Sequence, residues 1–199
     1  MRLTKEQNET VNPLLDNRQL RDKCVGRYEV LEQVKTLLLL PDNETATVKQ
    51  IAEYYSSIRT DEEKALGKKD IIISEDAIQK IYQRNKEEFS NDGVMVKKSK
   101  DFLNWTKCPS QRGSITMQFD NGKILTISNA GIKVFPKRAI LSIGMLLTGS
   151  EVSSEIRSQL LNIEEKTSTE IKTEDIEEEQ KLMLSVGMAV ASGDANAVA

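Results

Sequence analysis

The sequence predicts an α+β fold with several helices and a small antiparallel sheet. Apolar residues recur with the 3.6-residue period of a helix in several separate segments. Two short apolar segments flank Asp120 to Gly122, a turn that is typical of a β-hairpin. The chain of 199 residues has room for one domain of ordinary size or two small ones.

The composition does not favour an enzyme. The chain contains no histidine, so the usual general base and the commonest metal ligand are both missing. Its two cysteines, Cys24 and Cys108, lack the spacing of a disulfide framework or a zinc cluster, and no glycine-rich phosphate loop occurs. We therefore expect a non-enzymatic protein with no catalytic residues, no metal site and no cofactor.

The distribution of hydrophobic residues indicates a soluble protein. Apolar residues make up 38% of the chain and charged residues 30%. The longest apolar run near the N-terminus, Leu37 to Leu40, is far too short for a membrane span, and the polar start carries no secretory signal. We expect a cytoplasmic location and no contact with a membrane.

The net charge of −3 conceals an uneven distribution. Between Lys68 and Arg112 there are ten Lys and Arg against seven Asp and Glu. Between Glu164 and Gln180 there are two against eight. A basic middle followed by an acidic tail fits a body that faces DNA and a separate interaction segment, and ordinary surface charge explains it equally well.

The N-terminal segment is expected to be loose. Residues 1–26 are polar, lack a clear period and include Pro13, so we expect a flexible arm with one short helix at Asn17 to Lys23. An amphipathic helix is predicted over 28–40 and ends at Pro41. Its apolar stripe consists of Val30, Leu31, Val34, Leu37 and Leu38.

Two further helices are predicted before residue 90. Thr47 and Gln50 form a capping-box pattern that opens a helix over 47–55. Residues 56–69 are polar and indicate a loop or insertion, followed by a short strand at 71–73. Ser74 then caps a helix over 74–89, with Glu75 and Asp76 in its first turn, where the helix dipole favours acidic residues.

The second half of the chain is predicted to contain the strands. Asn91 to Gly93 is a strong turn, followed by a strand at 94–98. Segments 114–119 and 123–128 form the hairpin, and 132–135 adds a third strand. Helix 136–147 accepts Pro136 in its first turn, Thr148 and Gly149 turn the chain, and Ser150 caps the next helix. The apolar stripe of that helix is Val152, Ile156, Leu160 and Ile163.

The order of these elements indicates a winged helix-turn-helix: three helices, then a turn and a strand with trailing lysines. We therefore predict four parts. They are a flexible arm at 1–26, a winged helix-turn-helix-like domain at 27–106 with an insertion at 56–69, a small sheet plus helical hairpin at 107–165, and an acidic helical tail at 166–199.

In this kind of fold the third helix enters the major groove, where amide and guanidinium groups read base edges and lysines contact phosphates. An ordinary solvated helix carries the same residue types, however, and the link of about 18 residues before this helix is long for a helix-turn-helix. Glu87 and Glu88 would repel phosphate if they faced it. The expected DNA-binding residues are Gln79, Lys80, Gln83, Arg84 and Lys86 on the helix and Lys97, Lys98 and Lys100 after it.

Lys137 and Arg138 form a basic pair at the start of helix 136–147. Free backbone N–H groups at a helix start suit a phosphate, so the pair is included among the expected DNA contacts. Alternatively, the two residues only solubilise the entrance of a buried helix.

A series of short motifs resembles one protein family. Val30 to Lys35, Ile51 to Tyr55, Phe135 to Leu141 and Gly144 to Leu147, followed by Ser150 to Val152, are similar in order to phage and prophage antirepressor-like DNA-binding regulatory proteins of Gram-positive bacteria. The resemblance implies an N-terminal DNA-binding module and a protein that binds double-stranded DNA, a repressor, or both. The insertion at 56–69 departs from that pattern.

The sequence thus favours a non-enzymatic phage or prophage DNA-binding regulator. The alternative is an antirepressor-type module that captures a repressor protein through its acidic tail, which includes Glu174 to Glu179, without contacting DNA. A homodimer through the stripe that begins at Val152 is a further expectation, and packing within one chain would use the same stripe.

Overall fold

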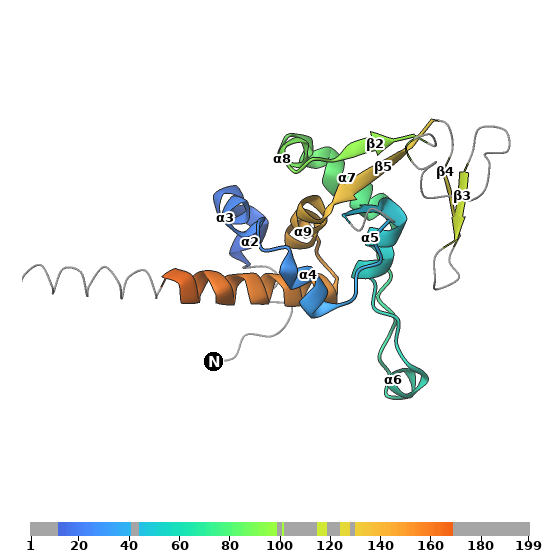
Figure 1. Cartoon of the computed structure of the whole chain (residues 1–199). Helices are drawn as coiled ribbons and strands as arrows, with labels where there is room; N and C mark the ends of the chain where they lie inside the picture. The colour runs from blue at the N-terminus through green and yellow to red at the C-terminus, as the bar shows by residue number, and fades with distance from the viewer. Residues whose placement is uncertain are drawn as a thin grey trace, which may run out of the picture. The chain divides into compact units, whose positions relative to one another are not determined.

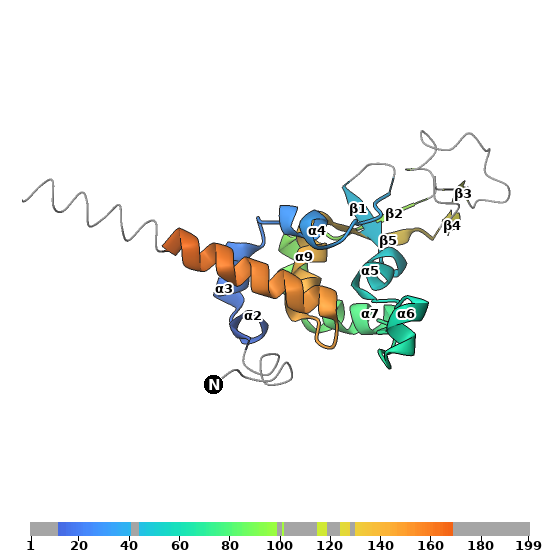
Figure 2. The same ribbon diagram turned by 90° about the horizontal axis from the view of Figure 1, so that it is seen from below.

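Figures 1 and 2 show the computed structural model of the chain, which describes residues 12–40, 44–98, 101, 115–118, 124–127 and 130–168. The chain divides into two compact units, Met1–Ser158 and Gln159–Ala199, and most described residues belong to the first. The first unit combines helices with a three-stranded antiparallel sheet, which confirms the predicted α+β class.

Within residues 12–26, the short helix predicted at 17–23 is confirmed as α3 (Arg18–Cys24), and a second short helix, α2 (Pro13–Asp16), precedes it. Asn12 and Asn17 cap them through their side chains, and Leu14 is fully buried. A long-range ion pair that the local sequence does not reveal anchors α3. Arg21 of α3 is buried against Glu88.

Helix α4 (Glu29–Val34) is shorter than predicted, because the backbone of Lys35 is already extended, with φ −161° and ψ 144°. The ammonium of Lys35 lies at the C-terminal end of α5 (Val48–Tyr55), where it donates to the carbonyl oxygens of Tyr54 and Ser56, each at 2.8 Å. A cation at this end of a helix is stabilised by the unsatisfied carbonyls and the helix dipole. These contacts hold Lys35 out of the helical path.

The capping box predicted at the start of α5 is confirmed. The Thr47 hydroxyl accepts from the Gln50 N–H at 3.3 Å, and the Gln50 side chain accepts from the Thr47 N–H at 2.9 Å. The residues just before it form an unpredicted strand, β1 (Thr45–Thr47), which is buried throughout. Its three residues are too few to show a strand period.

The insertion predicted at 56–69 is part of an ordered arm between α5 and α7 (Glu75–Arg84). The arm contains α6 (Asp61–Ala65), which has its own capping box from Thr60 and Glu63. Ser57 pairs with Ile71 at the base of the arm, so the predicted strand at 71–73 is reduced to a single bridge. Figure 1 shows the two extended stretches that lead to and from α6.

The helix predicted over 74–89 is interrupted. α7 ends at Arg84, and α8 (Lys86–Asn91) begins after Asn85, whose backbone leaves the helical region with φ −117° and ψ 32°. The Ile81 carbonyl accepts from both the N–H of Asn85, at 3.2 Å, and the Asn85 side chain, at 3.0 Å. Figure 2 shows α5 beside α7, against which it packs.

The central sheet has the strand order β1–β5–β2. β2 (Met95–Lys97) comes after the predicted turn, and β5 (Ile132–Pro136) pairs antiparallel with both neighbours. The predicted hairpin is confirmed as β3 (Ile115–Gln118) with β4 (Ile124–Ile127), but β5 does not extend it. Instead Ile127 packs on one face of β5, in a cluster with Leu40 and Val134.

The predicted helical pair after the sheet is present. Pro136 is the N-cap of α9 (Lys137–Leu146) rather than a first-turn residue, because it still belongs to β5. Ser150 caps the next helix, which occupies 151–158 in the first unit, and its hydroxyl also donates to the Tyr55 carbonyl at 2.7 Å. Val152 and Ile156 are buried, so this part of the expected dimer stripe packs within the chain. Residues 159–168 of the second unit are also helical.

Candidate nucleic-acid interface

Helix α7 has one buried and one exposed side. Ser74 caps it by accepting from the Ala77 N–H at 3.1 Å. Ile78 is fully buried, and the helix packs against α5 and α9. On the opposite side, residues spaced three or four positions apart are exposed, as expected for an amphipathic helix. The exposed side displays four of the predicted DNA contacts, Gln79, Lys80, Gln83 and Arg84.

Charge is not uniform along this exposed side. Glu75 and Asp76 occupy the first turn, whereas Lys80 and Arg84 lie one and two turns later. Lys80 forms an ion pair with Asp76 at 2.7 Å, but both side chains are exposed, so the pair is weak and the ammonium stays accessible. The second half of α7 is therefore the part that suits a phosphate backbone.

The break at Asn85 alters the surface just beyond the end of α7. Lys86 is exposed at the start of α8, close in sequence to Arg84. Glu88 points inward and is bound by Arg21, so it is not on the outer surface and cannot repel phosphate there. Glu87 remains exposed. The break therefore removes one of the two acidic residues that the uninterrupted helix places beside the basic surface.

The structure adds Lys133 of β5, which the sequence prediction missed. Its ammonium lies 4.0 Å from the centroid of the Tyr82 ring of α7, within the range of a cation–π contact. Tyr82 also packs edge-on against Phe135, with the ring centroids 5.7 Å apart. Residues 133 and 135 therefore face α7 from the sheet. The sequence did contain a signal for Lys133, because it occupies an alternate position of the predicted strand 132–135.

The predicted contacts after α8 do not all lie on this side. Lys97 is half-buried and pairs in register with Ile132, on the sheet face opposite to Lys133. Lys98 is exposed, and its N–H donates to the Asp101 carboxylate at 2.7 Å. Lys100 lies outside the described residues.

At the start of α9, the side chain of Arg138 and the backbone N–H of Lys137 are engaged in structural contacts. The Arg138 guanidinium binds the buried Asp92 carboxylate at 2.8 Å, and the Ser142 hydroxyl donates to the same carboxylate at 2.6 Å. The N–H of Lys137 donates to the Glu44 carbonyl at 3.2 Å, so it is not open to a phosphate. Lys137 and Arg138 are therefore left out of the candidate interface, which comprises Gln79, Lys80, Gln83, Arg84, Lys86 and Lys133.

Within the described part of the chain, no three His, Cys, Asp or Glu residues are grouped to hold a metal ion. No helix in that part is long and apolar enough to cross a membrane. Comparison with known proteins found no matching family model, no matching curated protein and no matching solved structure.

Proposed function

We propose that this chain is a non-enzymatic DNA-binding regulatory protein of the winged-helix type. The observation that carries the proposal is the order α4, β1, α5, α7, β2 and β5, together with the strand order β1–β5–β2. Helices α6 and α8 and the β3–β4 hairpin are inserted between these elements. In a winged helix a strand precedes a packed helix pair, and two further strands come later in the chain and pair with it in this order. The resemblance to phage and prophage antirepressor-like regulators is consistent with the same function in the cytoplasm.

The length of the link between α5 and α7 is compatible with this proposal. A helix-turn-helix packs two helices against each other, usually through a turn of about 3–4 residues. Here α5 and α7 are packed although an arm of about 18 residues connects them. Because Ser57 pairs with Ile71 at the base of the arm, the arm brings the chain back close to the end of α5, where the arm begins.

The exposed side of α7 has the chemistry for both kinds of DNA contact. The amides of Gln79 and Gln83 match the donor and acceptor pattern of base edges in the major groove. Lys80, Arg84, Lys86 and Lys133 supply positive charge for phosphates. Double-stranded DNA is therefore the partner we propose, bound mainly by the second half of α7.

A titration of fluorescently labelled duplexes from the protein's own genomic neighbourhood, at several salt concentrations, tests the proposal. We expect one duplex to bind with a steep salt dependence. A variant with Lys80→Ala and Arg84→Ala should bind it much more weakly. The matched control is Arg18→Ala with Lys64→Ala, which removes the same charge from exposed positions outside α7. Equal loss in both variants would show that only net charge matters, and no binding at low salt would refute the proposal.

The alternative function, capture of a repressor through the acidic tail, predicts a different result. Its acidic residues after 168 lie outside the described residues. Deleting 166–199 removes negative charge, so a DNA-binding protein should keep or increase its affinity for the duplex. A protein that acts by capturing a repressor should lose its partner in the same deletion.

A further inference from the structure

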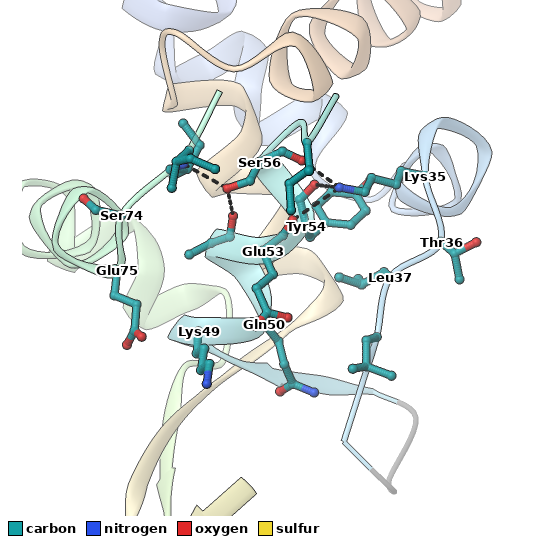
Figure 3. Close-up of a pocket in the computed structure, with 15 residues that line it drawn as sticks. Lys35, Thr36, Leu37, Lys49, Gln50, Glu53, Tyr54, Ser56, Ser74 and Glu75 are labelled. Carbon is teal, nitrogen blue, oxygen red and sulfur yellow. Dashed lines mark hydrogen bonds between the residues drawn. The ribbon is translucent and has the colours of Figure 1, made fainter. Parts of the chain in front are cut away.

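A groove runs along the outer side of α5, between the extended residues 35–38 and residues 72–75 at the start of α7 (Figure 3). Its volume is about 760 Å³. Two of its isoleucines, Ile58 and Ile72, are 75% and 66% exposed. Exposed isoleucines gathered in one groove are typical of a surface that another polypeptide covers. The other apolar side chains of the lining include Leu37, Leu38 and Ile73.

One wall of the groove carries main-chain groups that bind no other residue in the described part of the chain. The N–H of Leu37 is directed at the Glu32 carboxylate of α4, at 3.5 Å. Since successive N–H groups of an extended chain point to opposite edges, those of Thr36 and Leu38 face away from α4. Among the residues that the structure describes, none forms a hydrogen bond with the main chain of Thr36, Leu38 or Leu39. Such an edge is a template for pairing with another extended chain.

A buried donor lies at the lower end of the same groove. Gln50 is only 7% exposed, and its side-chain oxygen accepts from the Thr47 N–H. Its Nε2 has no hydrogen-bond partner within the described residues. Figure 3 shows this nitrogen on the side of the segment that carries Leu37. Because buried donors in native proteins are nearly always satisfied, the amide indicates that an acceptor lies outside the described residues.

We propose that this groove is the interface of a symmetric dimer of this chain, in which segments 36–39 of the two copies pair antiparallel. A two-fold interface sets one surface against itself, so its charges have to balance. The groove lining balances in this way, with Lys35 and Lys49 against Glu53 and Glu75, although the whole chain carries −3. The segment Thr36 to Leu39 contains no charge and no proline that would oppose pairing.

The dimer is independent of the proposed DNA contacts. The groove includes the first turn of α7 through Ser74 and Glu75, but neither Lys80 nor Arg84 lines it. The groove and the proposed DNA contacts therefore share no residue. Since the interface requires no DNA, dimer formation can be measured without DNA. A chain that does not dimerise and a chain that does not bind DNA are therefore distinguishable results.

Sedimentation equilibrium of the full-length chain without DNA, from about 1 to 100 µM, tests the dimer. Ile72→Asp places a charge in the groove, and Leu38→Pro removes an N–H from the open edge. The matched control is Leu66→Asp, because Leu66 is 80% exposed on the same arm but does not line the groove. Circular dichroism verifies that each variant is folded.

We expect a dimer in the wild type and in Leu66→Asp. Each groove variant should raise the dissociation constant by about 100-fold, since one substitution enters a two-fold interface twice. A wild-type chain that stays monomeric to about 100 µM would refute the proposal and leave the groove to a different polypeptide. A dimer of equal affinity in Ile72→Asp would refute it as well, because the interface would then lie elsewhere.

Discussion

Gly144 of α9 packs against the hydroxyl group of Tyr55 of α5 so closely that a Cβ on the glycine would overlap it. Tyr55 is fully buried, and its hydroxyl donates to the Ile140 carbonyl at 2.7 Å. Burial raises the pKa of Tyr55 well above its ordinary value, so the hydroxyl stays protonated as a donor. This contact fixes the distance between α5 and α9.

Gly144→Ala should destabilise the protein by about 1–3 kcal/mol, because the added methyl group forces Tyr55 or α9 to move. The better helix propensity of alanine offsets only part of this cost. Urea denaturation measures the change. Gly26→Ala is the matched control, since a Cβ at Gly26 meets no atom within 4 Å. An unchanged free energy of unfolding for Gly144→Ala would contradict the close packing.

The buried ion pair between Arg21 and Glu88 should contribute strongly to stability. The guanidinium binds both carboxylate oxygens at 2.9 Å, and it also donates to the Leu14 carbonyl at 2.9 Å. Hydrogen bonding to Glu88 raises the pKa of Arg21, so the guanidinium stays charged at every ordinary pH. Glu88→Ala should cost about 3–5 kcal/mol, because it leaves a buried charge without its counter-ion.

Thermal or urea denaturation measures this cost, with Asp22→Ala as the control. Asp22 is paired with Arg18 at 4.0 Å and half-exposed, so its loss should cost at most about 0.5 kcal/mol. Replacing both buried partners, by Arg21→Met with Glu88→Leu, should restore much of the stability. If Glu88→Ala were no more harmful than Asp22→Ala, α3 would not be anchored as the structure indicates.

The arm that contains α6 should loosen in acid. A hydrogen bond from Lys68 lowers the pKa of Glu63 below its ordinary 4.5, and the Arg59 N–H lowers the pKa of Asp70 below its ordinary 3.8. Groups with a lowered pKa stabilise the fold above their ordinary values, and this contribution is lost as the pH falls through the folded pKa. We expect {¹H}–¹⁵N NOE values in residues 57–73 to fall between about pH 5 and pH 3. Equal changes in α9 would point to general acid unfolding instead.

Lys133 should contribute to DNA affinity without reading sequence. Its ammonium is held beside α7 by the Tyr82 ring, and it offers one positive charge to a phosphate. Lys133→Ala should reduce the slope of log K against log salt by about one, and it should weaken all duplexes by a similar factor. Lys69→Ala, on the exposed arm, is the control and should leave the slope unchanged. A selective loss of one duplex would instead assign Lys133 to base contacts.

Local signals in the sequence predicted much of the fold. The reciprocal Thr47 and Gln50 cap, the Ser74 and Ser150 caps and the turn that ends at Gly93 each depend on a few adjacent residues. Such elements depend on chemistry within one turn of chain, so no distant partner is needed to predict them. The exposed residues of α7 were predicted for the same reason, from helical periodicity alone.

Contacts between distant residues decided the rest. Lys35 leaves the helical path because carbonyls about 20 residues later bind its ammonium, and β1 is a strand because β5 lies about 90 residues further along the chain. Arg21 is buried because Glu88 is there to pair with it. The position of Lys133 beside α7 depends on which face of β5 meets Tyr82. The sequence by itself determined the caps, the turns and the amphipathic sides of the helices. Only the tertiary structure decided which strands pair, which charges are buried and which lysines share a surface, since these depend on free energies gained when remote groups meet.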